Sequence, residues 1–232
     1  MLRYWVGVAV SAAMGTEHFD YVLVATGRTP NVAGIGLDQT KLKLDAKGVP
    51  LFDPTTTQTV SADGASPIFI AGDASNFIPL LHEATDEGRI AGENAARFAR
   101  GLQATHGLRR APIGVVFTDP QIGIVGGGFH ALKPATFATG QVSFEDQSRS
   151  RIMRKNKGLL NVYADLATGR LLGAEMLAPA AEHLVHLLAW ALQNEMTVMQ
   201  MLEMPFYHPV IEEGLRTSLR NLDAKLLKVK HQ

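Results

Sequence analysis

Residues 158–176 read GLLNVYADLATGRLLGAEM. Two strand-forming runs, residues 158–165 and 171–176, flank a polar turn that ends in Gly169-Arg170. Apolar and β-branched runs separated by a short glycine-containing turn are typical of a β-hairpin. The sequence therefore predicts a hairpin here, and the rest of this half of the chain can be placed around it.

Further strand patterns precede the hairpin, at residues 113–117, 122–125 and 141–144, and two helical patterns follow it. The helices predicted over residues 180–194 and 212–227 each carry a row of leucines on one face, as expected of helices that pack on a core. Strands followed by helices are typical of an α+β domain.

The first half of the chain has an α/β pattern. Residues 20–25, DYVLVA, form a continuous apolar run of the kind found in buried parallel strands, and residues 67–71, PIFIA, form a second one. A helix is expected over residues 79–101. The composition then becomes loop-like at residues 101–110, and we place a domain boundary there.

Charge and cysteine content exclude several classes of function. The 232 residues include 22 Lys plus Arg, 22 Asp plus Glu and no cysteine. A net charge of zero argues against a nucleic-acid partner, because phosphate binding needs a concentrated basic surface. Without cysteine the chain has no disulfide, no thiolate zinc site and no thiol nucleophile of its own.

The N-terminus allows two interpretations. Arg3 followed by the apolar residues 4–10 resembles a short signal peptide, but the same residues suit a β-strand with a turn at Met14-Gly15. The strand is favoured because the apolar run is short and has a single basic residue. No apolar run reaches the about 18 residues that span a bilayer, so we expect a cytoplasmic protein without membrane contact.

The C-terminal segment YHPVIEE, residues 207–213, holds a candidate acid–base pair. Pro209 suits the first position of a helix, which would place His208 at the exposed helix entrance. Glu213, about one turn into that helix, would reach back to the imidazole and fix its tautomer. The alternative is an ordinary helix start with acidic residues in its first turn.

A second candidate site lies after the strand predicted over residues 67–71. Gly72 would let a ligand approach the backbone, and Asp73 would accept hydrogen bonds from sugar or polyol hydroxyls. Leu81 and His82 would begin the next helix, whose free N–H groups suit an electron-rich ligand oxygen. The alternative is a simple Gly-Asp turn between a strand and a helix.

Two other patterns are interpreted as structural. Residues 126–131, GGGFHA, fit the spacing of a dinucleotide-binding turn, but Pro134 interrupts the helix that such a turn requires. His183 and His186 are three residues apart beside Glu182, without a third ligand at matching spacing, so we expect no metal site.

Several of these segments together resemble one family, the pyridine nucleotide–disulfide oxidoreductases, and within it the dihydrolipoamide dehydrogenase-like members. The similarity runs in order from about Asp20 to Leu222. It is carried by ATGRTPN (25–31), IFIAGD (68–73), LHEA (81–84), FTDPQI (117–122) and YHP (207–209) with Glu213.

The resemblance implies a domain organisation. Residues 1–19 would end an NAD-binding domain, and residues 20–110 would form the second segment of a Rossmann-like FAD-binding domain. Residues 111–232 would form an α+β interface domain through which the protein makes a homodimer. The implied fold class is therefore α/β followed by α+β.

The resemblance also implies roles for the candidate residues. Asp73, after Gly72, would bind the ribityl chain of FAD, and the backbone near Leu81 and His82 would face the flavin ring. His208 would act on the partner subunit's site as acid–base catalyst, with Glu213 orienting it. The peptide bond between His208 and Pro209 would be cis.

The family's two glycine fingerprints and its redox cysteine pair have no counterpart in this sequence. The chain is therefore expected to correspond to the C-terminal part of a flavoprotein, with the N-terminal half as a possible partner. That protein would move electrons between NAD(P)(H), FAD and a dithiol or disulfide. The alternative is a homodimerisation module with no activity of its own.

Overall fold

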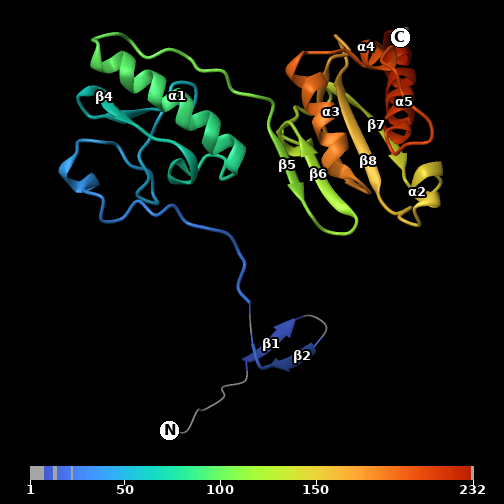
Figure 1. The fold of residues 1–232 in the computed structure, drawn as a ribbon, viewed down its shortest axis with the longest axis horizontal. Helices are drawn as coiled ribbons and strands as arrows, with labels where there is room; N and C mark the ends of the chain where they lie inside the picture. The colour runs from blue at the N-terminus through green and yellow to red at the C-terminus, as the bar shows by residue number, and fades with distance from the viewer. Residues whose placement is uncertain (1–7, 13–14, 22, 231–232) are drawn as a thin grey trace. The chain divides into compact units, whose positions relative to one another are not determined.

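A computed structural model describes residues 8–12, 15–21 and 23–230 of the chain (Figure 1). The chain divides into two compact units, Met1–Leu108 and Arg109–Gln232, which are described separately. In the part of the chain that the structure describes, no helix has the length and apolar character needed to cross a membrane.

The second unit is built on a five-stranded antiparallel sheet with the strand order β5-β6-β9-β8-β7. The predicted hairpin is confirmed as the β8–β9 pair at the centre of this order. All the predicted strands are present, with β7 beginning four residues earlier than expected. The strands are β5 (Ile113–Val116), β6 (Gln121–Val125), β7 (Phe137–Ser143), β8 (Leu159–Asp165) and β9 (Leu171–Ala178).

Two long helices pack on the sheet of the second unit (Figure 1). Helix α3 (Ala181–Gln193) contacts β5, β6 and β9, and helix α5 (Glu213–Lys230) contacts β7 and β8. The predicted leucine rows form the core, since Leu184, Leu188 and Leu219 are fully buried. The sequence patterns missed two single-turn helices, α2 (Ser148–Ile152) and α4 (Val198–Leu202), because five residues are too few to show a period.

The other face of this sheet is left partly open. Along β6, Gly123 and Val125 face the helices, whereas the alternating residues Ile122 and Ile124 are 38% and 39% exposed. The period of two in a strand produces this division, and the helices cover one of the two faces.

The first unit consists of short antiparallel hairpins and one long helix. Strands β1 (Val8–Ala12) and β2 (Gly15–Phe19) form one hairpin, so a strand near the N-terminus is confirmed for residues 8–12. The expected earlier strand residues and the turn residue Met14 lie outside the described residues. Strands β3 (Gln58–Ser61) and β4 (Gly64–Phe69) form the second hairpin, and α1 (Leu81–Ala99) is the predicted helix.

One strand prediction in the first unit is wrong, and a second is confirmed only in part. Residues 20–25 form no strand where they are described, and Leu23 and Val24 are 91% and 74% exposed. An apolar run becomes a buried strand only when neighbouring strands pair with it. The described residues provide no such neighbour for it.

The strand predicted over residues 67–71 is confirmed for residues 67–69, but its pairing and burial differ from the expectation. Strand β4 begins at Gly64, pairs antiparallel with β3 and ends at Phe69, and Ile68 is 39% exposed. The Ala62-Asp63 turn brings the preceding polar residues back as the partner strand, which the apolar pattern alone did not reveal. Among the described residues of this unit, every strand pairing is antiparallel.

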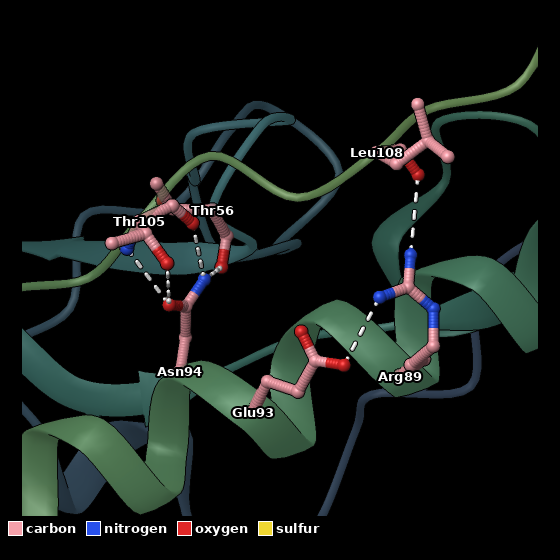
Figure 2. Close-up of polar contacts among 6 residues, drawn as sticks. All are labelled: Thr56, Arg89, Glu93, Asn94, Thr105 and Leu108. Atoms are coloured by element: carbon pink, nitrogen blue, oxygen red, sulfur yellow. Dashed lines mark hydrogen bonds and ion pairs between the residues drawn. The ribbon is translucent and has the colours of Figure 1, made fainter.

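Helix α1 is tied to the segment that follows it through Asn94 (Figure 2). The Asn94 Nδ2 donates to the carbonyl oxygens of Thr56 and Thr105, each at 2.9 Å, and its Oδ1 accepts from the Thr105 amide at 2.8 Å. Asn94 is 2% exposed. On the exposed side of the same helix, Arg89 pairs with Glu93 at 3.0 Å and reaches the Leu108 carbonyl.

We predict that Asn94→Ala destabilises the first unit by about 2–3 kcal/mol, because buried backbone groups lose their partners. The Thr105 amide should then exchange its hydrogen much faster, as measured by NMR. Glu93→Ala, which breaks an exposed ion pair on the same helix, is the control and should cost less than about 1 kcal/mol. Equal effects of the two substitutions would contradict the prediction.

Candidate functional site

The segment 203–212 forms the turn that carries His208. Its His208–Pro209 peptide bond is cis, as the resemblance implies. Pro209 does not open the helix as predicted, because α5 begins at Glu213. The Val210 amide donates to the Glu213 carboxylate at 3.2 Å, so the residues before Glu213 form a turn closed by its side chain.

His208 and Glu213 form the predicted pair. The His208 Nδ1 lies 2.9 Å from the Glu213 Oε1, and the two side chains are 71% and 30% exposed. An ionised carboxylate accepts a hydrogen bond, so Nδ1 carries the proton. Nε2 is then the nitrogen that can take up or release a proton toward a reacting group.

Electrostatics favour the ionised form of Glu213. The hydrogen bond from His208 lowers the pKa of Glu213 below its ordinary value, and the Val210 amide and the positive charge of Arg216 act in the same direction. Partial desolvation acts against them and is outweighed. Glu213 is therefore a carboxylate at neutral pH and can stabilise a positively charged imidazole beside it.

Two residues that the sequence analysis missed support this turn. Gln147 donates from its Nε2 to the Val210 carbonyl at 2.7 Å. The Arg216 guanidinium lies 5.6 Å from the centre of the Phe206 ring, two residues before His208. Neither belongs to a recognisable motif. Arg216 could have been noticed, because it lies three residues after Glu213 on the helix.

An apolar cavity of about 510 Å³ lies beside this turn. Tyr207, Val210 and Glu212 form part of its wall. Met204 and Phe206 of the same turn also line it, and the other large side chains come from α3, α4 and the segment between them: Leu187, Trp190, Met196 and Met201. The cavity therefore borders the segment that carries the histidine, although His208 itself does not line it.

The candidate residues of the first unit lie around the start of α1. Gly72 has a positive φ of 67°, and its amide donates to the buried Glu87 carboxylate at 2.7 Å. The Asp73 side chain is 55% exposed, and its Oδ2 lies 3.6 Å from the Arg28 Nη1. Arg28 also donates to the Pro79 carbonyl at 3.4 Å, next to the helix start.

Helix α1 begins at Leu81, and its first residues are accessible. Leu81 is 86% exposed, and the His82 side chain is 49% exposed with its Nε2 3.9 Å from the Glu83 Oε1. No side chain caps the helix start. The first amides of a helix lack partners within the helix, and the sequence-based interpretation of Leu81 and His82 rests on that general property.

The two patterns interpreted as structural show no cofactor geometry. After Gly126–Gly128 the chain forms a single 3-10 turn, Phe129–Ala131, instead of an α-helix. The His183 Nε2 lies 3.8 Å from the Glu182 Oε1. Among the residues that the structure describes, no group of three or more His, Cys, Asp or Glu side chains is placed to hold a metal ion.

Fold and site together describe a mixed α/β protein with a histidine–carboxylate pair on its sheet-based unit. Residues 113–219 match the family model described as pyridine nucleotide-disulphide oxidoreductase, dimerisation domain. The chain belongs to the pyridine nucleotide-disulphide oxidoreductase family and matches the C-terminal portion that includes the dimerisation domain.

Similar proteins include a reductase and two dehydrogenases. A mercuric reductase of Shigella flexneri is 30% identical over 94% of this chain and 38% of its own length. Dihydrolipoyl dehydrogenase 3 of Pseudomonas aeruginosa is 24% identical over 95% of this chain and 45% of its own length. An NAD(P)H dehydrogenase (quinone) of Mycobacterium tuberculosis is 28% identical over 96% of this chain. The chain thus spans less than half the length of these curated relatives.

Two solved structures share the fold of this chain. The crystal structure of LpdA from Mycobacterium tuberculosis superposes with a TM-score of 0.74 at 25% identity, over 93% of this chain and 46% of LpdA. The HOCl-induced flavoprotein disulfide reductase RclA from Escherichia coli has the same fold, with a TM-score of 0.71 at 19% identity.

We predict that His208→Ala raises the pKa of Glu213 toward its ordinary value, because the main group that lowers it is lost. A lowered folded-state pKa contributes stability at neutral pH that disappears as the pH falls through that pKa. The variant should therefore show a shallower loss of stability on the acid side. Carbon-13 NMR of the Glu213 carboxyl measures the pKa, and urea unfolding at several pH values measures the stability.

The matched control is His183→Ala, which removes another exposed histidine near a glutamate. It should leave the Glu213 titration unchanged. An unchanged Glu213 titration in His208→Ala would show that the pair does not form in solution.

Proposed function

We propose that the chain is the C-terminal part of an FAD-dependent oxidoreductase. The protein would move electrons between NAD(P)(H), FAD and a dithiol or disulfide, as a dihydrolipoyl dehydrogenase does. The observation that carries the proposal is the His208–Glu213 pair, formed at 2.9 Å within the unit that contains the family's dimerisation domain.

The proposed role of His208 is acid–base catalysis of thiol–disulfide exchange. The thiolate is the attacking species, so a base must take the thiol proton, and the departing sulfur must receive one. His208 Nε2 would accept and return that proton while Glu213 holds Nδ1 and stabilises the imidazolium. Because the sequence has no cysteine, the thiols must belong to a substrate or another polypeptide segment.

The first unit would hold the flavin. The observed groups suit that role: Gly72 has a positive φ, Asp73 presents an exposed carboxylate and the start of α1 is uncapped. Asp73 would bind the ribityl hydroxyls, and the backbone of Leu81 and His82 would face the ring. Bound FAD would supply the electron transfer between the nicotinamide and the sulfur pair.

The proposed domains follow from these roles. Residues 1–19 would end the NAD-binding domain, residues 20–110 would be the second FAD-binding segment, and residues 111–232 would be the interface domain. The proposed location is the cytoplasm, where thiols are kept reduced.

We also propose a homodimer formed through residues 111–232, as the name of the matched domain suggests. The second unit exposes large apolar side chains on and after α3, which suits a subunit contact. We call these the apolar surface: Leu187, Trp190, Met199, Met204 and Tyr207, which are 40–79% exposed.

A second candidate function is a homodimerisation module without activity of its own. Two observations favour it: the sequence contains no cysteine, and the apolar run at residues 20–25 has no partner strand among the described residues. A module would need the fold of the second unit and the apolar surface, but no flavin.

Visible absorption and turnover distinguish the two candidates. We expect the purified chain to be a colourless dimer with negligible turnover, and a bound, reducible flavin would contradict the module. When a segment with both glycine fingerprints and the cysteine pair is supplied, NAD(P)H-dependent disulfide reduction should appear. His208→Ala should lower it about 10²–10⁴-fold. Full activity of that variant would contradict the proposed catalytic role.

For the dimer, we predict that Trp190→Asp raises the dissociation constant at least about 30-fold, since a buried interfacial tryptophan typically contributes 2 kcal/mol or more. Analytical ultracentrifugation measures the change. Ile152→Asp is the matched control, because Ile152 is 64% exposed and Trp190 is 66% exposed. An equal effect of both substitutions would argue against the apolar surface as the contact.

A further inference from the structure

We propose that Gln147 is a positioning residue of the His208–Glu213 site. It would hold the turn between these two side chains in the geometry that lets them form a hydrogen bond. The catalytic importance of this role rests on the proposed function. The positioning itself rests on contacts that involve no cofactor or substrate.

The Gln147 side chain links two segments that are distant in sequence. Its Nε2 donates to the Val210 carbonyl at 2.7 Å, across 63 residues, and its Oε1 accepts from the Ser150 amide at 2.7 Å. The nitrogen of the Gln147 amide therefore binds an acceptor, and its oxygen binds a donor. These two partners define the orientation of the amide, which is then held at both ends.

Val210 is held on both sides of its backbone. Its carbonyl accepts from Gln147, and its amide donates to the Glu213 Oε2 at 3.2 Å. The other oxygen of the same carboxylate binds His208. A displacement of Val210 would therefore move or release the carboxylate that orients the imidazole. Gln147, Val210, Glu213 and His208 form one continuous chain of hydrogen bonds.

The segment that carries Gln147 is itself firmly attached. The fully buried Ser150 donates from its Oγ to the Phe144 carbonyl at 2.7 Å, just after β7. Phe144 is also fully buried, and its ring lies against the first turn of α5. A Cβ added at Gly214 would be 2.9 Å from the Phe144 Cε1. The backbone that carries Gln147 is thus anchored to the core, and its side chain reaches from there to the turn at Val210.

A competing explanation is that Gln147 serves only as the N-cap of α2, since its Oε1 binds the Ser150 amide. The two roles use different atoms of one amide group, so they can be separated. Gln147→Ser keeps a good N-cap acceptor but is too short to reach the Val210 carbonyl. It removes the link to the turn without adding a charge.

Thr197→Ala is the matched control, because Thr197 caps the five-residue helix α4 through a capping box, and within the part of the chain that the structure describes its hydroxyl bonds to Gln200 and not to the His208 turn. It should cost stability through a lost cap and leave the turn unaffected. Comparing the two variants therefore separates positioning of the site from capping of a short helix.

The test uses the full chain and two NMR measurements. In Gln147→Ser, hydrogen exchange of the Val210 amide should accelerate about tenfold or more, because its turn opens more readily. The pKa of Glu213 should rise, because its hydrogen bonds from Val210 and His208 weaken. In Thr197→Ala, both quantities should match those of the unmodified chain.

Each outcome has a definite meaning. If Gln147→Ser leaves both quantities unchanged, or if Thr197→Ala changes them equally, Gln147 is only a cap and the proposal is wrong. If Gln147→Ser changes them while His208→Ala leaves disulfide reduction intact, the positioning is real and the proposed function is wrong. The two proposals therefore fail by different measurements.

Discussion

The pairing of β8 with β9 is the interaction on which the second unit depends. Both strands lie inside the sheet: β7 pairs with β8, β6 pairs with β9, and the two long helices together contact all five strands. The strands can approach each other closely because glycines lie at two of their contacts. A Cβ at Gly158 would lie 1.8 Å from the Leu177 carbonyl oxygen, and one at Gly173 would lie 2.6 Å from that of Val125. Larger residues at either position would separate the strands.

The candidate site is positioned by the sheet and the helices that pack on it. Strand β7 ends next to Phe144, and the Phe144 ring packs against Gly214 one residue after Glu213. The helix start that carries Glu213 is therefore positioned by the core rather than by the exposed turn. His208, which is 71% exposed, is the least constrained member of the site and obtains its orientation from the carboxylate.

Much of the second unit could be predicted from sequence, because its strands have clear turns and its helices have clear leucine rows. The His208–Glu213 pair was also predictable as a proximity, although the helix start was placed too early. The role of Gln147 could not be predicted, because it lies 63 residues before Val210 and no local sequence pattern indicates a contact over that separation. The strand predicted at residues 20–25 was wrong, since burial of a strand depends on neighbours that its own sequence does not describe.

The solvent exposure of the His208–Glu213 pair limits what the pair contributes to stability. An exposed His–Glu pair contributes little to folding, about 1 kcal/mol or less. Yet this pair is held by the Val210 amide, the Gln147 side chain and a positively charged neighbour. Under the proposed function this support has a use, because the rate of proton transfer depends on holding the imidazole at a set orientation toward a reacting atom. Under the proposed function the reacting thiols would belong to a substrate or another polypeptide segment, because the sequence has no cysteine, and this support would prepare His208 for a site completed by them.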